Sequence, residues 1–218
     1  MTTDDLPCYG PDAVTEAFEA ADPADPTVVG VVLAGGTSSR FGEANKLLAE
    51  LEGEPLVRHA TRTLLDAGLA EVVVVVGHEA EAVRATLAGF DVQIVHNPDY
   101  DEGLSTTVER GLRAASDVDP NAVVFLPGDM PAVDPATVRQ LVDAYRAGLG
   151  TALAAASDGR RGNPVLFDQR HFDALLAVDG DVGGRPVLIE SDDSACITTD
   201  DPGVLQDVDT LEDLQRQR

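Results

Sequence analysis

Apolar residues recur along the chain in runs that lack polar alternation, at residues 28–33, 71–77, 92–95 and 121–126. Alternation of apolar and polar residues is typical of a strand with one solvated face, whereas a continuous run indicates a strand covered on both faces. We therefore expect four buried strands of a largely parallel sheet. Further apolar stretches predict strands at residues 151–156, 159–167, 195–198 and 204–208.

Segments with helical spacing of apolar residues separate these strands. Pro55 begins one such segment, in which Leu56, Ala60 and Leu64 share a face, and Gly68 follows its end. Other helices are predicted at residues 79–87, 103–115, 134–147 and 168–178, with a last short helix after Thr210. Strands that alternate with helices indicate an α/β fold, a doubly wound and mostly parallel sheet with right-handed crossovers and helices on both faces.

The first 26 residues differ from the remainder in composition. They carry several aspartates and four prolines, and only residues 14–21 could form a helical turn or two. We expect a mobile or loosely docked acidic extension at residues 1–26, followed by a single domain at residues 27–218.

The first strand leads into a glycine-rich turn, so that residues 27–46 read TVVGVVLAGGTSSRFGEANK. The turn contains neither GxxxxGK[ST] nor GxGxxG, which excludes the two commonest phosphate-binding loops. Gly35 and Gly36 would let backbone N–H groups approach an anion closely, and Arg40 and Lys46 add positive charge. Lys46 is the only lysine in the chain, although a surface lysine without a function is the alternative interpretation.

An acidic residue follows the fourth apolar run. Asp129 lies in the sequence PGDMP, just after the strand predicted at residues 121–126. Ligands of open α/β sheets bind at the carboxyl ends of the strands, so Asp129 is a candidate ligand of Mg2+ beside the glycine-rich turn. The alternative is that Gly128 and Asp129 only form a turn.

Composition narrows the range of partners. The formal net charge of −24 and the pI near 4.2 come from acidic residues spread along the whole chain. Such a chain would repel nucleic acids and anionic membranes, and it suggests a protein adapted to concentrated salt, a halophile. Cys8 and Cys196 show no metal-binding spacing, and the amino terminus lacks a secretory signal, so we expect a cytoplasmic protein.

The sequence LAGGTSSRFGEANKLL resembles the signature of the nucleotidyltransferases of the molybdenum cofactor group, close to LA(A/G)GxSxRxGxxK. The fixed positions are met at Leu33, Ala34, Gly35, Gly36, Ser38, Arg40, Gly42 and Lys46. The resemblance implies a Rossmann-like, GT-A-like nucleotidyltransferase whose nucleotide is bound by Leu33, Ala34, Gly35, Gly36, Ser38, Ser39, Arg40 and Lys46. Arg40, Lys46 and Asp129 would then be the catalytic residues.

Four later motifs extend the resemblance to residue 214. The stretch GLSTT after residue 102 is similar to the family pattern GLS(S/T)S, and GNPVLF and GDVGGR also match family motifs. They imply that Ser105, Thr106, Arg161, Asn163 and Arg185 contact the acceptor. DVDTLEDL implies that Asp209 is a second magnesium ligand; Asp207 is the alternative ligand, and Asp209 could instead cap the last helix.

This constellation predicts a magnesium-dependent transfer, in which a phosphate oxygen of the acceptor attacks the α-phosphorus of a nucleoside triphosphate and pyrophosphate leaves. The resemblance is closest to the cytidylyltransferases, which implies CTP, a molybdopterin-type acceptor, and a molybdoenzyme or chaperone as partner. Gly35 argues for the guanylyltransferases and GTP, because the cytidylyl branch usually has alanine there. The sequence is also compatible with a sugar-phosphate acceptor and with a catalytically idle nucleotide-binding protein.

Overall fold

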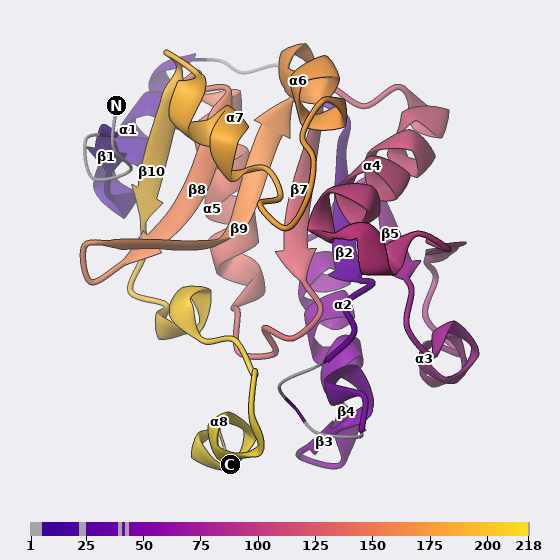
Figure 1. The fold of residues 1–218 in the computed structure, drawn as a ribbon. Helices are drawn as coiled ribbons and strands as arrows, with labels where there is room; N and C mark the ends of the chain where they lie inside the picture. The colour runs from indigo at the N-terminus through magenta and orange to yellow at the C-terminus, as the bar shows by residue number, and fades with distance from the viewer. Residues whose placement is uncertain (1–5, 22–24, 39–40, 42–43, 218) are drawn as a thin grey trace.

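The computed structural model describes residues 6–21, 25–38, 41 and 44–217. Its described strands form one large sheet in the spatial order β1-β10-β8-β9-β7-β2-β5-β6 and a small hairpin of β3 and β4 (Figure 1). The strand bounds are β1 Cys8–Tyr9, β2 Val28–Ala34, β3 Glu50–Leu51, β4 Glu54–Pro55, β5 Glu71–Val76, β6 Gln93–His96, β7 Ala122–Pro127, β8 Ala152–Ser157, β9 Arg160–Asp168 and β10 Ser194–Thr198. The predicted doubly wound, mostly parallel sheet is confirmed.

One strand departs from the parallel arrangement. β9 pairs antiparallel with both β7 and β8, whereas the other pairings in the large sheet are parallel. Asp158 and Gly159 join β8 to β9 and both have positive φ, of 51° and 70°. Two such residues form the tight turn that an antiparallel hairpin requires.

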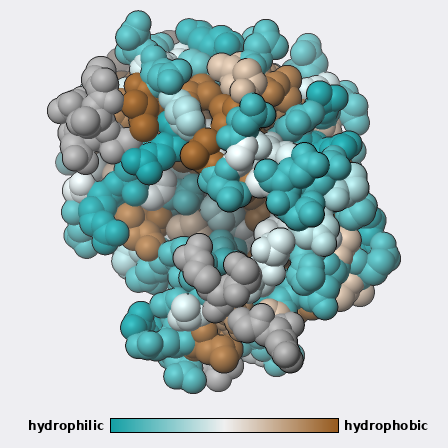
Figure 2. All heavy atoms as spheres, in the orientation of Figure 1, coloured by the Kyte–Doolittle hydropathy of each residue, from teal (hydrophilic) through white to brown (hydrophobic). Residues whose placement is uncertain are grey.

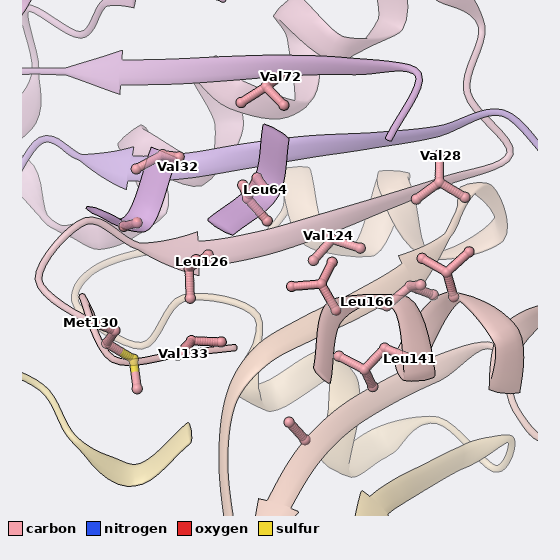
Figure 3. Packing of buried hydrophobic residues seen from close by; sticks show 14 of the residues in the cluster. Val28, Val32, Leu64, Val72, Val124, Leu126, Met130, Val133, Leu141 and Leu166 are labelled. Carbon is pink, nitrogen blue, oxygen red and sulfur yellow. The ribbon is translucent and has the colours of Figure 1, made fainter. Parts of the chain in front are cut away.

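Helices cover both faces of the sheet. Their bounds are α1 Pro11–Ala21, α2 Leu56–Asp66, α3 Ala80–Thr86, α4 Leu104–Ala115, α5 Pro135–Arg146, α6 Phe172–Leu176, α7 Arg185–Glu190 and α8 Leu211–Arg216. On one face α1, α2, α3 and α5 pack against side chains such as Val32, Val124 and Leu166 (Figure 3). On the other face α4, α6 and α7 pack against Val31 and Phe125. The continuous apolar runs are thus buried on both sides.

The chain changes direction in the sheet beside β2. From β2 it proceeds to β5 and β6 on one side, and it then crosses over to β7 on the other side of β2. The loops that follow β2 and β7 therefore leave the same edge of the sheet in adjacent positions. This is the topological switch point at which open α/β sheets bind ligands.

Residues 6–21 differ from the loosely attached extension that we expected. β1 pairs in parallel with β10 at the edge of the large sheet, and α1 packs against α5 with Val14 buried. The backbone bonds of a two-residue strand carry little sequence signal, because any residue can supply them. Residues 1–5 and 22–24 of the predicted extension lie outside the described residues.

Two predictions near the carboxyl end are wrong. No strand forms at residues 204–208: residues 204 and 205 belong to a 3-10 helix at Pro202–Leu205, whose start is capped by Asp201, which accepts a hydrogen bond from the backbone N–H of Gly203. The helix predicted at residues 168–178 begins later, because β9 continues to Asp168 and a 3-10 turn at Gln169–His171 precedes α6.

The face seen in Figure 2 is mostly hydrophilic, with hydrophobic side chains gathered over α6 and α7. Among the described residues, no helix combines the length and apolar character that crossing a bilayer demands.

Candidate active site

The glycine-rich turn after β2 is held by side chains within it. Ser38 has a φ of 55°, and its Oγ accepts a hydrogen bond from the backbone N–H of Lys46 at 3.1 Å. Asn45 accepts from the N–H of Leu47 at 3.0 Å and donates to the carbonyl of His78 at 3.2 Å. Asn45 therefore fixes the turn to the segment after β5. We did not single it out from the sequence, where its position directly before Lys46 is the available signal.

Lys46 lies between two carboxylates. Its Nζ is 2.5 Å from Oδ2 of Asp129 and 2.8 Å from Oδ1 of Asp209. The three side chains are largely shielded, with exposed fractions of 15%, 16% and 24%. The structure thus brings together three predicted site residues that are separated by up to 163 positions in the sequence.

Backbone contacts fix the two carboxylates relative to each other. Gly128 N–H donates to the carbonyl of Leu33 at 2.9 Å, which places Asp129 beside the end of β2. Val208 N–H donates to the carbonyl of Asp129 at 2.9 Å, and Val208 itself is buried. The segment that carries Asp209 is therefore tied directly to the segment that carries Asp129.

The structure separates Asp209 from the cap of the last helix. Thr210 is the N-cap of α8: its hydroxyl accepts from the N–H of Asp213, and the Asp213 side chain accepts from the N–H of Thr210. This reciprocal pair satisfies the helix start without Asp209. The structure therefore contradicts the alternative interpretation, in which Asp209 caps the last helix.

Burial and the neighbouring charges shift the pKa values of Asp129 and Lys46 in opposite directions. Burial raises the pKa of Asp129, and the nearby Lys46 ammonium opposes that rise only in part. Burial lowers the pKa of Lys46, but Asp129 and Asp209 outweigh it, so that the pKa of Lys46 is raised. Lys46 is therefore held as a cation at neutral pH. Asp207, which lines the same cleft, adds a further negative charge.

The cluster lies on the wall of a cleft of about 710 Å³. Of the predicted nucleotide-binding residues, Leu33, Gly35, Gly36 and Lys46 line the cleft, whereas Ala34 and Ser38 are buried behind it. Thr37, which we did not predict, also lines it. Ser39, Arg40 and Gly42 lie outside the described residues, so the predicted role of Arg40 stays a prediction.

A smaller pocket of about 250 Å³ shares part of its wall with the cleft. Arg161 and Asn163 from β9 line both spaces, and Arg185 at the start of α7 lines the smaller one. Three of the predicted acceptor-binding residues are therefore together. They come from β9 and α7, and α6 lies between these two elements in the sequence.

The other two predicted acceptor-binding residues do not line either space. Ser105 is buried, and the Thr106 hydroxyl donates to the carbonyls of Asp99 and Gly103. The first N–H groups of α4 are also taken: Leu104 N–H donates to Asp181 and Ser105 N–H to the carbonyl of Gly180. Thr107, one residue later, is the hydroxyl residue of this stretch that reaches the cleft.

The donor set is compatible with a divalent cation that substrate helps to hold. No group of three or more His, Cys, Asp or Glu side chains poised for a metal occurs in the described ranges. Mg2+ gives up its bound water molecules reluctantly and usually keeps several of them. It is therefore commonly bound by only one or two carboxylates together with substrate phosphates. Asp129 and Asp209 provide such a pair beside a turn suited to phosphates.

A family model and several curated proteins match this chain. The sequence model of a family described as "MobA-like NTP transferase domain" matches residues 30–195. The nicotine blue oxidoreductase of Paenarthrobacter nicotinovorans is 33% identical over 203 residues, which cover 88% of this chain and 96% of that protein. The bifunctional protein GlmU of Clavibacter sepedonicus is 37% identical over 149 residues, but the match covers only 30% of GlmU and 65% of this chain.

Solved structures with the same fold include two relatives of similar length. A nucleotidyl transferase from Methanothermobacter thermautotroptrophicus (Mth528) has a TM-score of 0.76 at 28% identity, covering 88% of this chain and 96% of that one. Rv0371c of Mycobacterium tuberculosis in complex with manganese has a TM-score of 0.72 at 26% identity, covering 88% of this chain and 97% of that one.

Proposed function

Because this chain belongs to the MobA-like NTP transferase domain family, we propose that it transfers a nucleoside monophosphate from a nucleoside triphosphate to a phosphorylated small-molecule acceptor, with a bound magnesium ion. The observation that carries the proposal is the contact of Lys46 with both Asp129 and Asp209 beside the glycine-rich turn. The acceptor phosphate is the nucleophile, and pyrophosphate is the leaving group.

Charge balance supports a metal at this position. Asp129 and Asp209 contact the one ammonium group and Asp207 lines the same cleft, so the carboxylates leave an excess of negative charge that would repel a triphosphate. A divalent cation held by Asp129 and Asp209 would neutralise this excess negative charge. When bound, it supplies electrostatic stabilisation of the charge that develops on the triphosphate oxygens. The manganese complex of Rv0371c supports a divalent metal for this fold.

The residues of this chain then have separate tasks. Backbone N–H groups of the turn at Gly35, Gly36 and Thr37 bind phosphate oxygens. Lys46 turns from the two carboxylates toward the phosphates and stabilises the departing pyrophosphate, together with Arg40. No strong general base is required, because an acceptor phosphate is already ionised at neutral pH.

The sequence motifs support a choice of substrates. We propose CTP as the nucleotide and a molybdopterin-type phosphate as the acceptor, which would make this protein a cytidylyltransferase of molybdenum cofactor biosynthesis, with a molybdoenzyme or chaperone receiving the product. GTP is the alternative nucleotide. The GlmU relatives support a sugar phosphate as the alternative acceptor.

Release of pyrophosphate tests the proposal. The full chain would be assayed in concentrated salt with Mg2+, each of CTP, GTP, UTP and ATP, and either a molybdopterin-type phosphate or a sugar 1-phosphate. We expect Lys46→Ala and Asp129→Ala to lower turnover by at least about 100-fold, the order of loss seen for a charge-stabilising group. Arg113→Gln is a matched control, since Arg113 pairs with Glu109 on the outer side of α4. Full activity of either site variant contradicts the mechanism.

A redox activity is the second candidate, because the oxidoreductase relative is similar over nearly its whole length. To test it, the protein would be given a reduced nicotinamide dinucleotide and a heteroaromatic hydride acceptor. The loss of absorbance of the reduced nicotinamide would measure hydride transfer. Oxidation of the nicotinamide without pyrophosphate release from any triphosphate favours this candidate. Tight nucleotide binding with neither activity favours an idle binding protein.

A further inference from the structure

The two faces of the sheet are covered unequally over β8, β9 and β10. On one face lie α1 and α5, which have 11 and 12 residues. On the other face α6 and α7 have only 5 and 6 residues, and a loop joins them in front of these strands (Figure 1). Short helices cover less of a sheet than long ones, so more of the apolar surface of this second face stays accessible.

Exposed apolar side chains gather on this second face. The described part of the chain has five exposed large hydrophobic residues, and three of them belong to this face: Leu104 at the start of α4, Leu176 in α6 and Val182 in the loop before α7. Figure 2 shows the hydrophobic side chains over α6 and α7 on an otherwise mostly hydrophilic view. Single exposed hydrophobic residues are ordinary, but a cluster of them marks an interaction surface.

A groove of about 590 Å³ lies between α6 and α7. Its apolar walls are formed by Ala174, Ala177, Val178, Val182, Pro186 and Val187. His171 also lines the groove, and burial lowers the pKa of this imidazole, so that it is uncharged at neutral pH. The helices that flank the groove bond their backbone groups internally and offer no sheet edge to an extended segment. An apolar occupant must therefore satisfy its own backbone groups, as a helix does.

The surroundings of this groove are acidic. Asp179 and Glu190 line it, and its described lining residues include neither lysine nor arginine. Residues 171–193 contain one arginine, Arg185, which lines the smaller pocket instead. The same segment contains six acidic residues: Asp173, Asp179, Asp181, Glu190, Asp192 and Asp193. This negative charge favours a basic occupant, whereas a second copy of the chain would bring two acidic surfaces together at a cost in free energy.

We propose that the groove between α6 and α7 docks a helix of another protein, one whose apolar stripe is flanked by lysine or arginine residues. The stripe packs between Ala174 and Val182, and the basic side chains pair with Asp179 and Glu190. Val182 also lines the smaller pocket, so the docked helix lies next to the spaces beside the candidate active site. The inference does not depend on the proposed function, because the groove would bind its partner whether or not the chain transfers a nucleotide.

Binding of designed peptides to the full chain tests the docking surface. The probe is a peptide of about 18 residues, five turns of helix, in which leucines form one stripe and lysines occupy the other positions. A second peptide has the same composition with the leucines spread around the helix, and a third has glutamate in place of lysine. All three would be titrated calorimetrically at one salt concentration, without nucleotide or metal. We expect the striped lysine peptide to bind at least about tenfold more tightly than either of the others.

Uncharged substitutions separate the groove from the overall charge of the chain. Val182→Asn and Ala174→Asn each place an amide at an exposed position of the apolar wall, and each should weaken the striped peptide at least about fivefold. Val118→Asn is the matched control, because Val118 is exposed to a similar extent, 42% against 50% for Val182, but does not line the groove. Glu190→Gln should also weaken the peptide, whereas Glu81→Gln in α3, on the opposite face, should not.

Three results would overturn the proposal. If the two lysine peptides bind equally, the net charge of the chain alone attracts them. If Val182→Asn and Ala174→Asn both bind the striped peptide as wild type does, the peptide does not occupy the groove. Sedimentation of the chain alone tests self-association: we expect a monomer, and a dimer that Val182→Asn dissociates would assign the groove to a second copy. Because peptide binding is measured without nucleotide, none of these results depends on whether pyrophosphate is released.

Discussion

A Cβ atom added at Gly35 would lie 2.4 Å from Oγ1 of Thr107, closer than side chains approach each other. Gly35 in the turn and Thr107 in α4 therefore fit each other, and the threonine occupies the volume that an alanine methyl at position 35 would need. The position of Thr107 Oγ1 therefore leaves no room for a side chain at residue 35. In the family that this chain resembles, the cytidylyl branch usually has alanine at the first of these positions and serine at the second.

We predict that Gly35→Ala destabilises the protein and that a second change, Thr107→Ala, relieves the steric part of this loss. Forcing a methyl group into a packed site costs about 1–3 kcal/mol. The double variant removes Oγ1 of Thr107, the atom nearest to the added Cβ, and with it the hydrogen bond from Asn97. The free energy of unfolding from denaturant titration measures both effects. Gly36→Ala is the matched control, because a Cβ at Gly36 would meet no atom within 4 Å. Equal stability of Gly35→Ala and the wild type would contradict the steric relationship.

Periodicity and glycine placement predicted most of the fold. The continuous apolar runs of β2, β5 and β7 predicted buried strands correctly. Both faces of these strands are covered, so their sequences do not alternate between apolar and polar residues. Asp129 could be placed next to the turn because a strand end and a loop at one edge of a parallel sheet must be close. The co-location of Lys46 and Asp129 followed from that topology.

The sequence did not allow us to predict the contacts that single side chains make. Nothing in the spacing of Ser105, Thr106 and Thr107 shows which hydroxyl reaches the cleft, because the 180–181 segment, far along the chain, takes the first N–H groups of α4. The same holds for β1, whose pairing is with a strand near the other end of the chain. Such long-range pairings have no local pattern.

The capping box at Thr210 should affect catalysis through the position of Asp209. Thr210→Ala removes the hydroxyl that accepts from Asp213 N–H, a loss of about 1 kcal/mol for a helix N-cap, and frees the start of α8. We expect kcat, measured with Mg2+, to fall. The affinity for the triphosphate, measured without metal, should stay unchanged. Thr210→Ser keeps the hydroxyl and should retain wild-type kcat. A loss of activity as large in Thr210→Ser as in Thr210→Ala would remove this account.

The Tyr145 hydroxyl should stabilise the protein in a pH-dependent way. It donates to Oδ2 of Asp168 at 2.6 Å. Burial alone would raise the pKa of Asp168, but hydrogen bonds from Tyr145 and Arg170 outweigh it, and the pKa lies below its ordinary value of 3.8. Because the folded-state pKa is depressed, this stabilisation is fully present above pH 3.8 and is lost as the pH falls through the folded-state pKa.

We therefore predict that Tyr145→Phe lowers the free energy of unfolding by about 1.5–3 kcal/mol at pH 7, the range for a hydrogen bond to a charged group. The difference from wild type should shrink when denaturant titrations are repeated in steps below pH 3.8. Tyr9→Phe is the control, because the Tyr9 hydroxyl makes no hydrogen bond within the described residues. A difference that stays constant down to the lowest pH would show that Asp168 is not the group involved.

Oxidation can test the docking of β1. Cys8 and Cys196 are direct partners in the parallel pairing of β1 with β10, and both are free thiols. Neighbouring strands are about 5 Å apart, within the Cα separation of disulfides. Burial and the neighbouring Cys8 raise the pKa of Cys196 to about 11, so the exposed Cys8 is the thiol that reacts first. We expect diamide, which accepts two electrons and two protons, to link the pair within one chain.

The linked protein should resist denaturant more than the reduced protein, by about 2–4 kcal/mol, because the bond closes a loop of nearly the whole chain. Mass spectrometry of peptides would identify the bond through the loss of two hydrogen atoms, and reduction should reverse the gain in stability. Cys8→Ser, treated in the same way, should gain nothing. If both thiols of the wild type react with an alkylating reagent but never with each other, β1 does not occupy the edge of the sheet in solution.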